Sequence, residues 1–288
     1  MATVARVRAR VQTRVEAQAT RDRALLRTFL ERDRLFAGYA LCDLDDREFP
    51  RTRWGVAVAD GRPIAVGMEY SGLSPQSLFV MGEPEGIEAV LRRIIRPRAA
   101  FVACLPEVLP SVSLVYRTEA APTMVRMWVD RRTFRPHGGI AMRLLPAEIG
   151  DLNRLYGLGF TTWLPAEAIM SGVYYGVRVA GRLIAAAGTH VVSPSVGMAV
   201  VGNVMTHRDY RNHGYAKLVT SAVTQDLLRS VDQVVLNVRS DNPPAIAAYR
   251  ALGFDEHIRF DERLAHRRGP GLGTLLWPIR RLFSNREP

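Results

Sequence analysis

The chain has 288 residues, of which 48% are hydrophobic, and this composition predicts a packed globular protein with room for two domains. No apolar run approaches the roughly 20 residues that a membrane-spanning helix needs, which excludes that class of protein. The formal net charge is +11, almost all of it from arginine because Lys217 is the only lysine, and such a field favours phosphate-bearing partners without choosing among them.

Residues 1–20 form a basic arm in which Val4, Val7, Val11 and Val15 recur at helical spacing. Arginines interrupt this segment, so it lacks the continuous apolar run of a signal peptide. The only cysteines, Cys42 and Cys104, lie in apolar surroundings. We therefore expect buried, reduced thiols in a cytoplasmic protein. Nucleic-acid binding by the arm is the less favoured alternative.

Residues 21–130 alternate between helical and strand-like patterns, which predicts an N-terminal α/β domain. A helical pattern covers residues 21–40, and a second one covers 86–95. Strand-like runs cover 54–59, 63–70, 77–82, 99–105 and 123–130, with turn signals at Asp60-Gly61 and Ser74-Pro75. The polar segment 131–139, rich in Gly and Pro, is the predicted linker.

Residues 140–262 show a similar order of elements, which predicts a second domain and suggests an internal duplication. Strand-like runs cover 140–145, 174–180, 182–192, 196–205, 233–238 and 255–260, and helical patterns cover 146–157, 165–172, 214–230 and 243–253. A hairpin is expected about Gly181-Arg182, and Gly202 marks a bulge or a close approach. The fold class is therefore α/β (α+β), with a mixed sheet flanked by helices.

The stretch THRDYRNHGYAKLV, residues 206–219, joins a predicted strand to a predicted helix. The first turn of a helix has unpaired N–H groups and the positive end of the helix dipole. Gly214 and Ala216 leave these amides accessible, while Arg211 and Lys217 add positive charge. The spacing Arg-x-x-Gly-x-Ala therefore predicts an anion-binding loop.

A second stretch, NVRSDNPPAIAAYRALGF at residues 237–254, places Asn242 after a strand and Tyr249 two turns into a helix. Together with VMTHRDYRNHGYAKLV, it resembles the GNAT superfamily of acyl-coenzyme A dependent N-acyltransferases over residues 140–262. The first stretch matches the pyrophosphate-loop pattern of the family, Gln/Arg-x-x-Gly-x-Gly/Ala. The second matches its Asn…Ala-x-x-x-Tyr-x-x-x-Gly-Phe segment.

The resemblance implies an acetyl-CoA site. The backbone of Val204, Met205 and Thr206 would follow the pantetheine arm, and Asn242 would contact it. The pyrophosphate would meet Arg211 and the amides of Asn212, His213, Gly214, Tyr215, Ala216 and Lys217. Tyr249 stands where many members have a tyrosine that protonates the departing thiolate, a role that a phenol can fill. The alternative for Tyr249 is a packing role on a helix face.

The resemblance implies direct attack of an amine on the thioester, and the six histidines show no metal-ligand spacing, so no metal is expected. Some members have a glutamate five residues before the Asn, where this chain has Asn237. His190 is the candidate base, with His207 and Asp209 as alternatives, and water-mediated deprotonation or a hydroxyl acceptor stays open. The predicted function is an N-acetyltransferase, and the alternative is a non-catalytic acetyl-CoA-sensing module.

The N-terminal block resembles a degenerate GNAT domain that lacks the anion loop, because Glu83 and Glu85 stand after its third strand-like run. An unrelated α/β domain is the alternative. Residues 263–288 form a basic amphipathic tail. Packing of this tail on the N-terminal block or on a second subunit of a homodimer is favoured over contact with a membrane surface. Nucleic acid is not a favoured partner.

Overall fold

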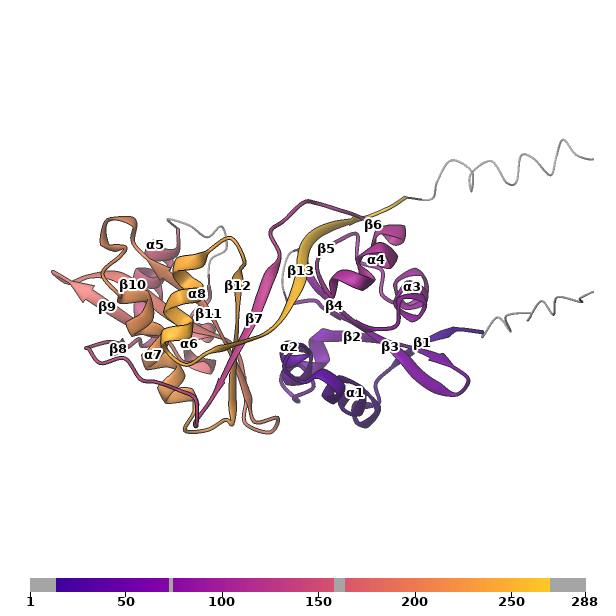
Figure 1. Cartoon of the computed structure of the whole chain (residues 1–288), viewed down its shortest axis with the longest axis horizontal. Helices are drawn as coiled ribbons and strands as arrows, with labels where there is room; N and C mark the ends of the chain where they lie inside the picture. The colour runs from indigo at the N-terminus through magenta and orange to yellow at the C-terminus, as the bar shows by residue number, and fades with distance from the viewer. Residues whose placement is uncertain (1–13, 73–74, 158–163, 270–288) are drawn as a thin grey trace, which may run out of the picture.

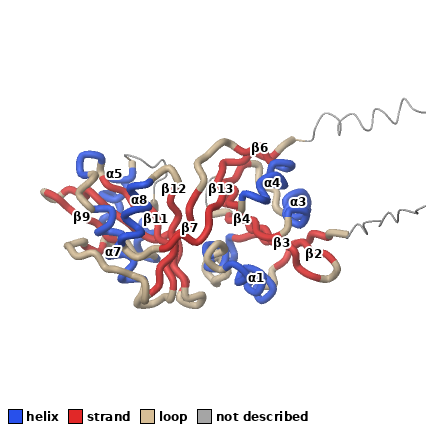
Figure 2. Tube along the Cα trace, in the orientation of Figure 1, coloured by secondary structure: helices blue, strands red, loops and turns tan. Residues whose placement is uncertain are grey.

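The structure is a computed structural model of the whole chain that describes residues 14–72, 75–157 and 164–269. One mixed sheet of 13 strands runs through both halves of the molecule (Figure 1), in the order β1-β2-β3-β4-β5-β13-β7-β12-β11-β10-β9-β8, with β6 beside β13. Helices flank this sheet in both halves (Figure 2). The predicted fold class, a mostly antiparallel mixed sheet with flanking helices, is confirmed.

The N-terminal half contains the elements up to β6. They are β1 (Glu16–Thr20), α1 (Arg23–Leu30), α2 (Gly38–Cys42), β2 (Thr52–Ala59), β3 (Arg62–Tyr70), β4 (Gln76–Gly82), α3 (Pro84–Arg93), β5 (Ala99–Cys104), α4 (Leu109–Val115) and β6 (Tyr116–Thr118). Strands β2, β3 and β4 are antiparallel neighbours, and α3 crosses over to β5, which lies parallel to β4.

The C-terminal half repeats this order after β7 (Met124–Asp130). Its elements are β8 (Met142–Arg143), α5 (Ile149–Tyr156), α6 (Ala166–Ser171), β9 (Tyr175–Val179), β10 (Arg182–Ser193), β11 (Met198–Thr206), α7 (Tyr215–Leu227), β12 (Gln233–Arg239), α8 (Pro243–Ala251) and β13 (Asp255–Arg267). Strands β9, β10 and β11 are antiparallel, and α7 crosses over to the parallel strand β12. The duplication suggested by the sequence is thus visible in the topology.

The two halves exchange strands at the centre of the molecule, where β7 and β13 lie in Figure 1. Strand β7 leaves the N-terminal half and pairs antiparallel with β12. The first part of β13 pairs with β7, and its second part returns to pair with β5. One continuous sheet results. The predicted boundary at 131–139 falls in a loop, whereas the one at 262 falls inside β13; as limits of separate domains both stay predictions.

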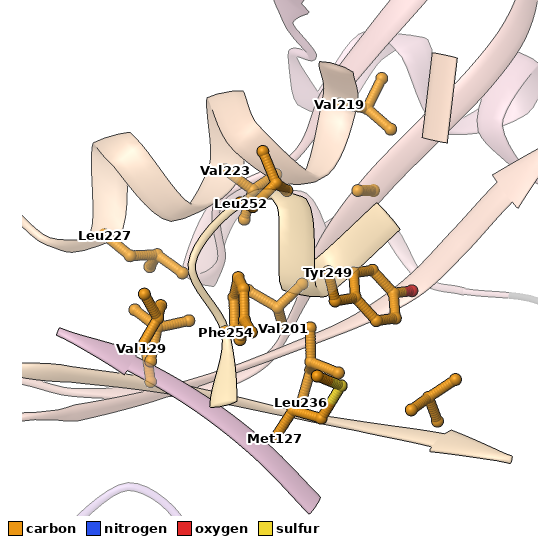
Figure 3. Close-up of a cluster of buried hydrophobic side chains, with 14 of the residues drawn as sticks. Met127, Val129, Val201, Val219, Val223, Leu227, Leu236, Tyr249, Leu252 and Phe254 are labelled. Atoms are coloured by element: carbon orange, nitrogen blue, oxygen red, sulfur yellow. The ribbon is translucent and has the colours of Figure 1, made fainter. Parts of the chain in front are cut away.

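Helices α7 and α8 cover one face of the C-terminal strands (Figure 3). Val219, Val223 and Leu227 recur every four residues along α7, so they lie on one face and pack against the sheet. The opposite face of these strands meets α1 and α2, where Leu41 and Phe260 share a buried cluster with Met198 and Val235. The apolar interior therefore continues from one half into the other.

Local signals account for the remaining differences from the predicted elements. The helical pattern at 21–40 forms α1 and α2 separately, because Asp33 turns the chain by accepting a hydrogen bond from the amide of Phe36 (3.1 Å). Helix α4 was not predicted, since Pro106 and Pro110 mask its pattern. The helical pattern predicted for the basic arm is wrong for its last residues, because Glu16–Thr20 form strand β1 and pair with β2; residues 1–13 of the arm and 270–288 of the tail lie outside the described residues. No helix in the described part of the chain is long and apolar enough to cross a membrane.

Candidate active site

The parallel strands β11 and β12 separate partway along their length. They pair from Met198–Gln233 to Val201–Leu236, although β11 continues to Thr206 and β12 to Arg239. Beyond this point, the backbone groups that face the neighbouring strand have no ladder partner. An extended ligand that enters between the strands can therefore bond to the exposed edges.

A β-bulge marks the start of this opening. The register between β10 and β11 shifts at Asn203, whose φ of 53° lies in the left-handed region. Two tyrosines of the C-terminal half fix the bulge: Tyr156 donates its hydroxyl proton to the Asn203 carbonyl (2.6 Å), and the Asn203 side-chain amide donates to the Tyr174 hydroxyl (3.2 Å). The bulge and its clamps thereby set the direction in which β11 leaves β12.

The loop between β11 and α7 exposes free backbone amides. Asn212 (φ 65°) and Gly214 (φ 79°) both adopt the left-handed conformation, and Gly214 is the N-cap of α7. The first helical hydrogen bond runs from the amide of Leu218 to the Gly214 carbonyl (3.0 Å), so the amides before it are not used by the helix. A Cβ atom on Gly214 would meet nothing within 4 Å, which means that a ligand can approach here.

The charge at this loop suits an anion. Residues 211–214 are exposed, and α7 contributes the positive end of its dipole over 13 residues. His213 stabilises the loop, since its Nδ1 lies 2.6 Å from the Arg211 carbonyl and its ring stacks on Tyr215 (6.0 Å between centroids). Arg211 and Lys217 flank the free amides, and Ala216 keeps the first turn small. This combination fits a pyrophosphate group.

The residues expected to line the pantetheine arm lie along the unpaired end of β11. Val204 packs toward the core under α7 and α8, whereas Met205 points to the opposite face, into the cluster that contains Tyr174. The hydroxyl oxygen of Thr206 is buried and has no hydrogen-bond partner among the described residues. A buried polar atom of this kind can bind a polar group of a ligand.

Helix α8 contributes Asn242 and Tyr249. The Asn242 side chain caps α8 by accepting a hydrogen bond from the amide of Ala245 (3.3 Å), so part of its role is structural. Tyr249 is 7% exposed and packs against Phe254 beneath α8 (Figure 3). Its hydroxyl makes no hydrogen bond to a described residue. Burial raises the pKa of Tyr249 to about 12, which keeps the phenol protonated at neutral pH.

His190 occupies the opposite face of the sheet at the same opening. It is the extra residue in an irregularity of β10, and its ring lies over Gly202, where a Cβ atom would stand only 1.9 Å from Nε2. The sequence predicts a bulge or the close approach of another backbone at Gly202; the register shift lies next to Gly202, and the group that approaches it is the His190 side chain. The ring lines a cavity between the two halves, and burial lowers the pKa of His190 to about 4. His190 is therefore a neutral hydrogen-bond acceptor at pH 7 and a weak base.

The cavity that His190 enters lies between the two halves and has a volume of about 380 Å³. Tyr39 of α2 and Asp43, which follows this helix, contribute to one side, and Arg126 of β7 and Asn237 of β12 to the other. Sequence patterns did not indicate this cavity, because its residues come from distant segments that meet only through the exchange of β7 and β13. Unpaired polar atoms of Arg126 and Asn237 are the structural signal for it.

Two acidic side chains that line the cavity, Asp43 and Glu262, have raised pKa values. Burial, followed by the neighbouring charges of Glu48 and Asp45, raises the pKa of Asp43 to about 8. Burial also raises the pKa of Glu262, although the positive charge of Arg126 opposes this effect. With this pKa, the carboxyl group of Asp43 can exchange protons near neutral pH.

The other two base candidates belong to the anion loop. His207 is buried, its Nε2 lies 2.9 Å from Nη2 of Arg182, and its Nδ1 accepts a hydrogen bond from the amide of Asp209 (3.3 Å). These contacts anchor the start of the loop. The described residues contain no group of three His, Cys, Asp or Glu side chains arranged to hold a metal ion.

This architecture, with an antiparallel sheet, a diverging parallel pair and an amide-rich helix start, is that of the GNAT fold. Residues 174–264 match the model of the family described as FR47-like protein. This segment runs from β9 into β13, and it is similar to GNAT acetyltransferases of the FR47-like type.

A curated relative, a mycothiol acetyltransferase from Tsukamurella paurometabola, is 36% identical to this chain over 80 residues. The match spans 27% of this chain and 27% of that protein, about a quarter of its length.

Solved structures extend the similarity to the whole fold. A tandem GNAT protein from the clavulanic acid biosynthesis pathway covers 90% of this chain and 100% of its own, with 16% identity and a TM-score of 0.54. A Drosophila protein covers 87% and 98%, with 11% identity and a TM-score of 0.64. A putative GNAT acetyltransferase from Novosphingobium aromaticivorans covers 70% and 89%, with 19% identity and a TM-score of 0.54. The fold therefore resembles a tandem GNAT protein.

Proposed function

We propose that this chain transfers an acetyl or other short acyl group from acyl-coenzyme A to an amine that binds in the cavity between the two halves. One observation carries the proposal. The anion loop, with its free amides at Gly214, and the unpaired ends of β11 and β12 lie next to each other, and the cavity opens at the point where these strands part. The FR47-like GNAT domain supports acyl-CoA as the donor.

Acyl-CoA supplies an activated acyl group as a thioester. The amides around Gly214 bind its pyrophosphate, and the unpaired edge of β11 between Val204 and Thr206 binds its extended arm. An amide of this edge donates a hydrogen bond to the thioester carbonyl oxygen and stabilises the negative charge that develops there. The protonated hydroxyl of Tyr249 donates to the departing sulfur.

The amine approaches from the cavity, on the face opposite to α7 and α8. His190, which is neutral, accepts a hydrogen bond from the amine and orients its lone pair. With a pKa of about 4, His190 does not take a proton from an alkylammonium ion in solution. Asp43, with a pKa of about 8, is the better proton acceptor in the same cavity.

A second candidate function, a non-catalytic acetyl-CoA sensor, rests on Asn237. This residue occupies the β12 position where some GNAT proteins have a glutamate, and its Oδ1 is buried without a partner. An amide cannot accept a proton at neutral pH. The sensor would bind acetyl-CoA through the same loop.

Two measurements on the full chain separate these functions. Calorimetry should show one acetyl-CoA bound per chain. Release of free coenzyme A thiol should then accelerate when particular amines from a broad panel are added. Binding without amine-dependent thiol release would support the sensor, and the absence of binding would exclude both functions.

A further inference from the structure

The guanidinium of Arg126 is buried without a hydrogen-bond partner for two of its nitrogens. Arg126 lies on β7, directly opposite Asn237 of β12, and is only 3% exposed. Its Nε and Nη1 form no hydrogen bond with any described residue. The Asn237 oxygen beside it is also unsatisfied. Burying an unpaired charge is expensive, so a cation in this state indicates a missing partner.

Aromatic rings surround Arg126, and no carboxylate of the described residues forms a salt bridge with it. Its guanidinium carbon lies 5.2 Å from the ring centre of Tyr39 and 5.4 Å from that of Phe260. Burial lowers the pKa of Arg126, and Tyr39 and Glu262 are the largest opposing influences. Arginine nevertheless stays protonated in proteins.

The position of Arg126 connects it to the proposed acceptor site. Residues opposite each other on neighbouring strands point to the same face, so Arg126 and Asn237 share the face on which His190 lies over Gly202. All three side chains line the cavity of about 380 Å³. This face is the one opposite to the anion loop and α7, so the donor pyrophosphate does not neutralise Arg126.

We propose that the acceptor is a small amine that also carries a carboxylate, and that Arg126 binds this carboxylate. A guanidinium matches a carboxylate through two parallel hydrogen bonds. The same cavity contains the carboxyl groups of Asp43 and Glu262, which can accept hydrogen bonds from the amino group, so the cavity offers a polar partner to each end of such a molecule. Met68, Phe79 and Phe260 provide an apolar wall for the rest of the molecule. This inference rests on the proposed function for the identity of the amine, but not for the binding of a carboxylate.

Matched substrates test the inference with the unmodified protein. The probes are phenylalanine, phenylalaninamide and phenethylamine, with leucine, leucinamide and isopentylamine as a second series, each with acetyl-CoA. We expect kcat/KM for the carboxylates to exceed that for the amides and plain amines by roughly 10-fold or more. Arg126→Met should abolish this preference. Equal use of carboxylates and amides by the unmodified protein would overturn the inference.

Thermal stability gives a second test that is independent of turnover. Because Arg126 lacks partners, Arg126→Met should raise Tm by a few degrees. Arg34 is the matched control: its Nη1 and Nη2 donate to the Gln233 side chain and the Val196 carbonyl, both at 2.8 Å, so Arg34→Met should lower Tm. If Arg126→Met lowers Tm as well, Arg126 is a structural residue and the inference is wrong.

Binding distinguishes failure of this inference from failure of the proposed function. In the presence of coenzyme A, phenylalanine and leucine should raise the Tm of the unmodified protein but not that of Arg126→Met, even if no amine is acylated. An equal Tm response in both proteins would contradict the assignment. A carboxylate on the acyl group is the competing source. Faster transfer from succinyl-CoA than from acetyl-CoA to phenethylamine, lost in Arg126→Met, would overturn the assignment to the acceptor.

Discussion

The two halves of the molecule have the same order of strands and helices, yet their loops at the crossover helix differ in every property that an anion needs. In the C-terminal half, Gly214 precedes α7 with open space in front of it. In the N-terminal half, Gly82 has a φ of 122°, and a Cβ atom there would stand 2.2 Å from the Ile64 carbonyl oxygen. That loop is packed against β3 and cannot admit a ligand.

The backbone donors differ in the same way. The amide of Glu83 is already bonded to the Ile64 carbonyl (2.9 Å), and Pro84 at the first position of α3 has no N–H group. Glu83 and Glu85 add negative charge where Arg211 adds positive charge. The fold therefore places a loop before the crossover helix in each half, and the local residues favour an anion in the C-terminal loop and disfavour one in the N-terminal loop.

Gly214→Val should have the largest effect on acetyl-CoA affinity. It would make the loop before α7 as inaccessible to a ligand as the loop before α3. Valine strains the left-handed conformation and places a branched side chain in front of the free amides. We expect acetyl-CoA affinity, measured by calorimetry, to fall roughly 10- to 100-fold. Gly61→Val is the matched control, because Gly61 has a φ of 75° and equally open surroundings far from the loop.

Both variants should lose a similar amount of stability, and only Gly214→Val should lose affinity. Equal affinities in the two variants would mean that the loop before α7 does not bind the pyrophosphate. In that case the contrast between Gly82 and Gly214 would have no functional meaning.

The anion loop could be predicted from the sequence because a strand, a loop and a helix start are encoded by neighbouring residues. Gly214 and Arg211 lie three positions apart, and the pattern needs no information about the rest of the fold. The same holds for the capping position of Asn242 and for Tyr249 on α8. Local sequence therefore identified the predicted donor side of the site.

The acceptor side could not be predicted in this way. Tyr39, Arg126 and Glu262 belong to three distant segments, and they meet only because β7 and β13 cross between the halves. In the sequence, Arg126 is one arginine among many, within an ordinary strand pattern. The role proposed for it rests on burial without a hydrogen-bond partner for two of its nitrogens, which is a property of the tertiary structure.

Helices α4 and α8 occupy equivalent places in the two halves, and their seventh residues are Val115 and Tyr249. Tyr249→Phe tests whether the phenol of α8 has a function that α4 lacks. Loss of the phenol should lower kcat by roughly 10- to 100-fold if it donates to the leaving sulfur, with little change in acetyl-CoA affinity. Tm should not fall, because the hydroxyl has no hydrogen bond to lose among the described residues.

The matched control is Tyr116→Phe in the N-terminal half. The Tyr116 hydroxyl donates to the Pro97 carbonyl (3.2 Å), so its removal should affect Tm but not kcat. An unchanged kcat in Tyr249→Phe would leave Tyr249 with a packing role beneath α8.

Asp43→Asn should give the smallest effect and tests how the N-terminal half contributes to the cavity. Burial raises the pKa of Asp43 from 3.8 to about 8, so the folded protein retains a proton that the unfolded chain has lost between these values. The free energy of unfolding of the unmodified protein therefore falls as pH rises through this range. Asn does not titrate, so the free energy of unfolding of Asp43→Asn does not fall for this reason. The Tm of Asp43→Asn minus that of the unmodified protein should thus be small at pH 5 and grow toward pH 9.

The matched control is Asp46→Asn, which removes an exposed carboxylate from the same segment, so its Tm difference should not grow with pH. A difference for Asp43→Asn that stays constant with pH would show that Asp43 is ionised in the folded protein, and would remove it as the proton acceptor in the cavity.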